Sequence, residues 1–276
     1  MFRKSAEAGD ASGMDNLGVM YLEGSGVDKD YGQALTWFRK AAGAGDIDAI
    51  YGLGYMYENG YGVEKDEQTA VSWYRRSAEA GNAMGMRALG YMYENGRGVS
   101  KDMQEAVSWY RKSVEAGNAE AMNSLGWMYQ NGQGVSKDLQ EAVGWYRKAV
   151  EAGYATAMNN LGWMYKTGQG VERDYEQAVA LFRSAAEAGN AGGMDNLGWM
   201  YLSGDGVVRD FERAFTLFEK GAAAGNTDSM YGLGYMYENG YAVEKNHQRA
   251  ITWYRKAAQL GDQNAKAALK RLGESQ

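Results

Sequence analysis

The sequence predicts an all-α protein, a solenoid of tandem 36-residue repeats. A methionine and a tyrosine recur at this spacing from Met20 and Tyr21 onward. A leucine followed by a glycine recurs with the same period, at Leu17, Leu53, Leu89, Leu125, Leu161, Leu197 and Leu233. Self-similarity with a period of about 20 to 50 residues is typical of repeat architectures, whose units stack to bury their apolar faces.

The expected organisation is a single array of seven helix-turn-helix repeats, with a half repeat before them and a capping helix after them. The half repeat covers residues 1–10 and the capping helix covers 263–276. The repeats run at about 11–46, 47–82, 83–118, 119–154, 155–190, 191–226 and 227–262. Because the chain opens like the tail of a repeat, we expect a trimmed chain or a fragment of a longer protein.

The first helix of each repeat is predicted from an apolar stripe with i, i+3, i+4, i+7 spacing, in the first repeat Met14, Leu17, Gly18 and Tyr21. An Asp or Asn suited to the N-cap precedes each stripe in the first four repeats, at Asp10, Asp46, Asn82 and Asn118. The helix is expected to end at Gly24, where positive φ carries no steric penalty. Asn59, Asn95, Asn131 and Asn239 are interpreted as C-capping residues.

The second helix is predicted to begin at Asp30 and its equivalents, and to bury a stripe that includes Trp37 and Phe38 between the small residues Ala34 and Ala41. A capping box is expected with the residue three positions on, at Gln33, Glu105, Glu141 and Gln177. The indoles of the Trp37 position are all assigned to the core. They are Trp37, Trp73, Trp109, Trp145 and Trp253.

Composition excludes several classes of function. The chain has no Cys, which rules out disulfides, thiolate zinc sites and a cysteine nucleophile. Its net charge of −6 argues against a nucleic-acid partner. It has no run of about 18 apolar residues, so no membrane span is expected. Neither a metal nor a cofactor is expected.

The repeat pattern resembles that of Sel1-like repeats, relatives of tetratricopeptide repeats. The residues that carry the resemblance are A-x-x-x-L-G-x-M-Y-x-x-G-x-G-V-x-x-D-x-x-x-A-x-x-W-[YF]-R-K-A-A-E-A-G-N, as in the run from Ala119 to Gly153. The resemblance implies a right-handed superhelical solenoid with a concave inner face, used by adaptor proteins that are often bacterial. It favours a periplasmic or secreted protein whose signal peptide has been removed, with a cytoplasmic location left open. The cysteine-rich branch of the family is not a source of function here, because every such Cys is absent.

Some repeats depart from the pattern. Leu181 and Leu217 stand where the other repeats have Trp, and Ala242 replaces the second loop glycine. Asn246 and His247 change the start of the last second helix, so the final repeat is expected to be slightly looser. These individual changes favour natural duplication over a consensus design.

A series of aromatic residues marks the candidate binding face. Position 19 lies about 140° from the centre of the first-helix stripe at about 100° per residue, yet six of its seven occupants are aromatic. This ring series is Tyr55, Tyr91, Trp127, Trp163, Trp199 and Tyr235, with Val19 in the first repeat. Two interpretations stay open: rings that pack between repeats, or exposed anchors for a partner, with Trp127, Trp163 and Trp199 as the strongest.

The same face is predicted to be acidic. Its helical-wheel neighbours are Asp15, Glu23, Asp48, Glu58, Glu94, Glu120, Asp195, Asp228 and Glu238, opposed by Arg87 and Lys166. Nine acidic and two basic side chains leave a local excess of seven negative charges. The candidate site is therefore the ring series together with Glu58, Glu94 and Asp195, and the expected partner is a basic or polar protein or peptide. A solvated acidic face without a ligand is the alternative.

The predicted function is a non-catalytic, monomeric scaffold or adaptor for protein–protein interaction. The single histidine, His247, has no equivalent in other repeats, and no nucleophile, base and oxyanion hole coincide. No catalytic residues are therefore assigned. A carbohydrate-binding module, whose rings would stack on sugars, and a structural or designed repeat scaffold without a ligand are the alternatives.

Overall fold

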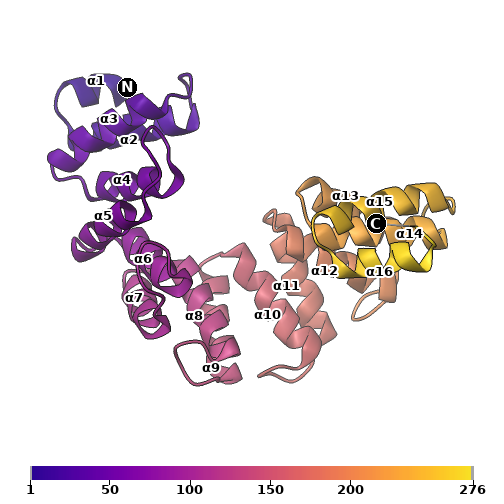
Figure 1. Ribbon diagram of the computed structural model, residues 1–276. Coiled ribbons are helices and arrows are strands. Elements are labelled where there is room, and N and C mark those ends of the chain that lie inside the picture. The colour runs from indigo at the N-terminus through magenta and orange to yellow at the C-terminus, as the bar shows by residue number, and fades with distance from the viewer. Residues whose placement is uncertain (1, 275–276) are drawn as a thin grey trace. The chain divides into compact units, whose positions relative to one another are not determined.

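The computed structural model describes residues 2–274, within which the secondary structure consists of sixteen α-helices (Figure 1). This confirms the prediction of an all-α helix-turn-helix repeat protein. Residue 1 of the expected half repeat, and residues 275 and 276 of the expected capping helix, lie outside the described part. Between residues 2 and 274, no helix is long and apolar enough to cross a membrane.

The chain divides into two compact units, residues 1–138 and 139–276, here called the N-terminal unit and the C-terminal unit. The helices of the N-terminal unit are α1 (Phe2–Glu7), α2 (Ala11–Glu23), α3 (Tyr31–Gly43), α4 (Ile47–Asn59), α5 (Glu67–Glu79), α6 (Ala83–Asn95), α7 (Met103–Glu115) and α8 (Ala119–Asn131). Those of the C-terminal unit are α9 (Leu139–Glu151), α10 (Ala155–Thr167), α11 (Tyr175–Glu187), α12 (Ala191–Ser203), α13 (Phe211–Ala223), α14 (Thr227–Asn239), α15 (His247–Gln259) and α16 (Gln263–Arg271). Within each unit, every helix packs against the next one in the chain.

The helix ends follow the predicted capping residues. The first helices are N-capped by side chains that accept a backbone N–H of the first turn, from Asp10, Asp46, Asn82, Asn118, Asn190 and Asn226. Tyr154 stands at the N-cap of α10 and makes no such bond. Each first helix ends at a glycine in the left-handed region, as at Gly24 with φ 80°. These local signals place the helices where the 36-residue period predicts them.

The second helices are also capped as predicted, but not by capping boxes. The Asp30 carboxylate accepts the Gln33 N–H at 2.9 Å. The Asp30 N–H, which the Gln33 side chain would accept in a capping box, instead donates to the Tyr21 carbonyl at 2.9 Å. The equivalent N–H donates to the equivalent tyrosine carbonyl in every repeat, and in the seventh repeat the two residues are Asn246 and Tyr237. The predicted capping boxes at Gln33, Glu105 and Gln177 are therefore wrong, because the loop uses the backbone N–H that each of them needs. The capping box predicted at Glu141 stays a prediction.

The ring next to the tryptophan, and not the indole itself, fills the core of each repeat. Phe38 and its equivalents, among them Tyr74 and Phe218, are at most 2% exposed. The ring of Tyr74 lies over Gly54, where an added Cβ would be 2.5 Å from the ring carbon Cδ1. The glycine that follows each leucine therefore makes room for an aromatic ring from the second helix.

The indoles of the Trp37 position are only half-buried, so their assignment to the core is wrong. Phe38 continues the Ala34 and Ala41 stripe, whereas position 37 lies at its edge, against the preceding repeat and the solvent. A cation covers the outer face of the ring in each case, as where Lys40 Nζ lies 4.3 Å from the Trp37 centroid. The indoles thus seal the junction between repeats from the outside.

One loop residue adopts a conformation that alanine disfavours. The second loop glycine has positive φ in the first six repeats, and Ala242 takes the same conformation with φ 59°. An added Cβ at Gly62 or Gly206 would lie 2.5 Å from a backbone oxygen of the preceding second helix. The expectation of local looseness in the last repeat thus has a physical basis at Ala242, because its Cβ occupies a left-handed and crowded position.

We expect Ala242→Gly to raise the free energy of unfolding by about 1 kcal/mol, because it removes both the left-handed penalty and the crowding. Urea denaturation followed by circular dichroism measures the change. Ala180→Gly, in the exposed interior of α11, is the control and should lower stability by about 1 kcal/mol. A loss of stability in Ala242→Gly would contradict the strain.

Candidate functional site

The ring series of the N-terminal unit becomes more exposed from α4 to α8. Tyr55 is half-buried, with its ring centroid 5.8 Å from that of Tyr61. Tyr91 is 39% exposed, and the Arg97 guanidinium lies 5.8 Å from its ring centroid. Trp127 is 40% exposed. Because most bulky aromatic side chains in this fold are covered, Tyr91 and Trp127 offer apolar surface to a partner.

In the C-terminal unit the ring series shows both of the open interpretations. Trp163 is 42% exposed, and Lys166 Nζ lies 5.1 Å from its ring centroid. Trp199 is half-buried and packs between repeats, with its ring centroid 6.1 Å from Tyr231 and 5.8 Å from Tyr235. An aromatic residue at Tyr231, where α12 has an aspartate, provides the packing partner. That change of residue type between repeats was the sequence signal that separates Trp199 from Trp163.

The carboxylates of the candidate site make internal bonds. Glu58 accepts the Tyr74 hydroxyl at 2.5 Å and pairs with the Arg97 guanidinium at 2.6 Å. Glu94 accepts the Tyr110 hydroxyl at 2.5 Å. In each case burial and the nearby carboxylate raise the pKa of the buried tyrosine, so its hydroxyl stays a donor. Arg97 lies in a loop 39 residues from Glu58, which is why the wheel of one helix did not include it.

Asp195 is buried between two first helices. It is 7% exposed and accepts the Ser229 hydroxyl of α14 at 3.2 Å. Burial, together with the charge of Asp228, raises its pKa to about 7, against the opposing effects of Ser229, Lys166 and Trp199. Asp195 therefore lies beneath the predicted acidic surface and not on it.

A groove in the N-terminal unit combines aromatic rings with three carboxylates, of which Asp48 accepts a hydrogen bond from the Asn82 amide at 2.6 Å. It has a volume of about 670 Å³ and lies between α2 and α4, and we call it the N-terminal groove. Tyr31, Tyr51, Tyr55 and Tyr61 supply its aromatic wall. Tyr31 and Tyr61 stack with centroids 4.5 Å apart, which holds the wall in place. Of the predicted ring series, Val19 and Tyr55 line this groove.

The N-terminal groove is electronegative. Asp15, Glu23 and Asp48 line it, opposed by Lys29. Burial raises the pKa of Asp15 to about 6, and the charges of Asp46 and Asp48 act in the same direction. Burial and neighbouring carboxylates disfavour the ionised form of this carboxyl group, and a nearby cation stabilises that form. The groove is therefore suited to a basic side chain.

Metal ions in proteins are held by clusters of side chains. Within residues 2–274, no group of three or more His, Asp or Glu side chains is placed to hold a metal ion. His247 is exposed at the start of α15.

Comparison with protein families decides the identity of the repeats. The family model described as Sel1 repeat matches this chain seven times, at residues 11–46, 47–82, 83–118, 119–154, 155–190, 191–226 and 227–262. The chain belongs to the Sel1 repeat family. Proteins with Sel1 repeats generally act as scaffolds for protein–protein interaction and are typically not catalysts. None of the curated proteins matches this Sel1-repeat chain significantly.

Solved structures agree with this assignment. A Sel1 repeat protein from Oxalobacter formigenes is 34% identical, with a TM-score of 0.81 over 90% of this chain and 99% of its own. A protective antigen present in uropathogenic Escherichia coli strains is 38% identical, with a TM-score of 0.73 over 98% of this chain. This chain spans 58% of the length of that antigen. An immunity protein from Pseudomonas aeruginosa, 22% identical with a TM-score of 0.55 over 78% of this chain and 83% of its own, shares the fold alone.

Proposed function

We propose that this Sel1-repeat protein is a non-catalytic scaffold that binds a basic segment of a partner protein on the first-helix face of its N-terminal unit. The N-terminal groove carries the proposal, because it places three carboxylates beside an aromatic wall. A Lys or Arg side chain in such a groove gains both ion pairing and contact with ring faces.

The exposed rings extend the proposed surface along the same unit. Tyr91 on α6 and Trp127 on α8 continue the series that begins in the groove at Tyr55. Large aromatic side chains lose little conformational entropy on binding and are frequent anchors of protein interfaces. Trp163 offers a comparable exposed ring on α10 of the C-terminal unit. Trp199 is assigned to packing within its unit, which changes the set of anchors expected from the sequence.

We expect Trp127→Ala to weaken partner binding at least about tenfold while leaving the fold intact, because it removes an exposed anchor. The probe is the peptide most enriched when a displayed random peptide library is selected on the wild-type chain. Its affinity for both chains is measured by isothermal titration calorimetry. Val208→Ala is the control, because Val208 is 86% exposed in a loop outside the ring series.

The same titrations test the charge of the groove. The paired variant Asp15→Asn with Asp48→Asn should weaken the peptide at least about tenfold, and added salt should weaken the wild-type complex. Affinity should also fall from pH 7.5 to pH 5, because protonation of Asp15 removes a negative charge from the groove. The proposal would be contradicted if the enriched peptides lacked basic residues. It would also be contradicted if the peptide bound Trp127→Ala and the paired aspartate variant as tightly as it binds wild type. A ligand found only among glycans would favour carbohydrate binding instead.

A further inference from the structure

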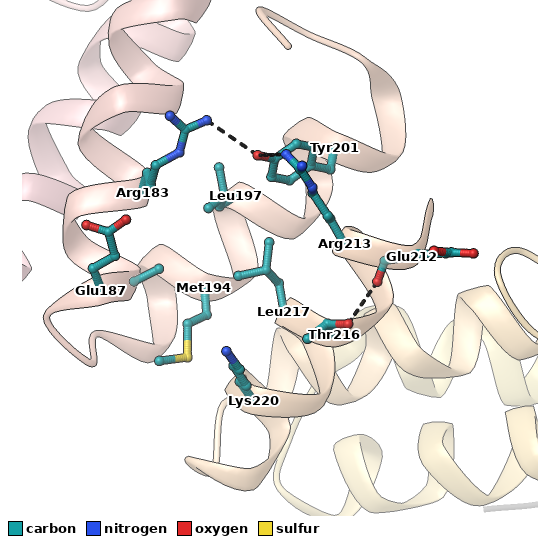
Figure 2. A pocket seen from close by; sticks show the side chains of 11 residues that line it. Arg183, Glu187, Met194, Leu197, Tyr201, Glu212, Arg213, Thr216, Leu217 and Lys220 are labelled. Atoms are coloured by element: carbon teal, nitrogen blue, oxygen red, sulfur yellow. Dashed lines mark hydrogen bonds between the residues drawn. The ribbon is translucent and has the colours of Figure 1, made fainter. Parts of the chain in front are cut away.

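A second cavity lies on the opposite face of α12 from Trp199. It has a volume of about 530 Å³ and is walled by α11, α12 and α13 of the C-terminal unit (Figure 2). Met194, Leu197 and Leu217 supply its apolar lining. A volume of this size is typical of pockets that hold one small ligand or one large side chain. No part of the proposed function involves this cavity.

The cavity lies where other repeats have an indole. Leu217 occupies the Trp37 position, and the tryptophan of other repeats packs against the two preceding helices, as Trp73 does against α3 and α4. Those two helices correspond here to α11 and α12. A leucine at this position leaves the space of the larger ring unfilled.

The cation that covers the indole in other repeats is also present in this repeat, although the indole itself is absent. Lys112 Nζ lies 3.8 Å from the Trp109 centroid and Lys256 Nζ lies 4.3 Å from the Trp253 centroid. Lys220 is their equivalent and lines the cavity, but it has Leu217 beside it in place of a ring. The other repeat without the indole also lacks the cation, because Ser184 stands three residues after Leu181, at the position that Lys220 has after Leu217. A missing indole and a retained cation therefore coincide only in this repeat of the described chain.

Two guanidinium groups meet at the rim of the same cavity. Arg183 donates to the Tyr201 hydroxyl at 3.4 Å, and Arg213 donates to it at 3.2 Å (Figure 2). Burial raises the pKa of Tyr201, but the hydrogen bonds and charges of both arginines outweigh it and lower the pKa. At the equivalent tyrosines of the other repeats, such as Tyr57 and Tyr93, an arginine donates to the hydroxyl.

Among the side chains that line the cavity itself, the positive charges outnumber the negative ones. Arg183, Arg213 and Lys220 face two acidic residues, Glu187 and Glu212. Figure 2 shows the Glu212 carboxylate directed away from the space between Arg183 and Lys220. The half-buried Asp210 carboxylate pairs with Arg213 Nε at 3.2 Å, and the guanidinium keeps further donors for a ligand. A guanidinium binds a carboxylate through two parallel N–H···O bonds, so Arg183 and Arg213 both suit a carboxylate ligand.

We propose that this cavity binds the C-terminal residue of a partner peptide when that residue is aromatic. The ring would occupy the space above Leu217 beneath Lys220, and complete the cation–ring contact that other repeats make internally. The terminal carboxylate would lie at Arg183 and Arg213. Arg213 and Lys220 are seven residues apart on α13, which corresponds to about 10 Å of helical rise. Flexible side chains and one aromatic residue can bridge this distance.

The test is calorimetric titration of the full chain with the tripeptide acetyl-Ala-Ala-Phe, as its free acid and as its C-terminal amide. The acid should bind wild type at least about tenfold more tightly than the amide. Leu217→Trp, which restores the residue of other repeats, should fold and weaken the acid at least about tenfold. Leu181→Trp, the same change one repeat earlier, should bind as wild type.

Arg213→Gln should weaken the acid at least about tenfold and the amide little, whereas Arg249→Gln, its equivalent one repeat later, should have no effect. No saturable binding of the acid, equal binding of acid and amide, or unchanged binding in Leu217→Trp would each overturn the proposal. Trp127→Ala should leave this binding unchanged, so the proposed function can fail without affecting this result.

Discussion

Gly54→Ala should lower the free energy of unfolding by about 3 kcal/mol, because its methyl group overlaps a buried ring. An added Cβ would lie 2.5 Å from Cδ1 and 2.6 Å from Cε1 of Tyr74. The ring has little freedom to move, because it is 1% exposed and its hydroxyl is bonded to Glu58. Relief therefore requires α4 and α5 to separate, which exposes their shared apolar surface.

Urea denaturation measures this change, with Gly144→Ala as the matched control. Gly144 is also in the interior of a helix, α9, but an added Cβ there meets nothing within 4 Å. Gly144→Ala should raise stability by about 0.5 to 1 kcal/mol, because alanine has the higher helix propensity. Losses of similar size in both variants would show that the packing of Tyr74 on Gly54 is not the cause.

Asp195 should make the stability of this protein fall as pH rises. Its pKa is about 7 in the folded chain, against an ordinary value of 3.8. Between these values the folded state holds a proton that the unfolded state has released, so the free energy of unfolding decreases with rising pH. The stabilisation is fully present below about pH 4 and is lost by about pH 7 to 8. A pKa shift of this size corresponds to a loss on the order of 4 kcal/mol.

Asp195→Asn should abolish this component of the pH dependence. An amide suits the site, because Asn159 occupies the equivalent position of α10 and accepts a hydrogen bond from Asn196 at 2.9 Å. The variant should match wild type near pH 4 and exceed its stability near pH 8. Denaturation curves at each pH measure the difference between the two chains.

The comparison of variant with wild type separates Asp195 from other carboxyl groups whose pKa is raised by burial, such as Asp15 and Asp228. Asp28→Asn, at an exposed loop position, is the control and should follow the wild-type profile. Parallel profiles for wild type and Asp195→Asn would contradict the assignment of the proton to Asp195.

The local structure of every repeat could be predicted from the sequence. Helix starts at Asp10 and Asp30 and the end at Gly24 depend on bonds that form within a few residues. The buried leucine and alanine positions, such as Leu17 and Ala34, follow from a period that is repeated seven times. These features depend on local sequence, so a single repeat already contains the information.

The candidate site could be predicted only in part. The wheel placed the ring series opposite the core, and the structure leaves Tyr91, Trp127 and Trp163 exposed there. It could not show that Trp199 packs on Tyr231, because that depends on which residue the next repeat brings alongside. Nor could it show that Arg97 neutralises Glu58, because the two lie on different segments of the fold.

The sequence by itself determined the period, the helix boundaries and the membership of this protein in a family of helical repeats. The tertiary structure decided which of two adjacent rings, Trp37 or Phe38, enters the core, and it turned the single change at Leu217 into a cavity. The physical reason is that burial is a property of contacts between repeats. Residues about 30 to 40 positions apart meet there, and one altered side chain changes what its neighbour must cover.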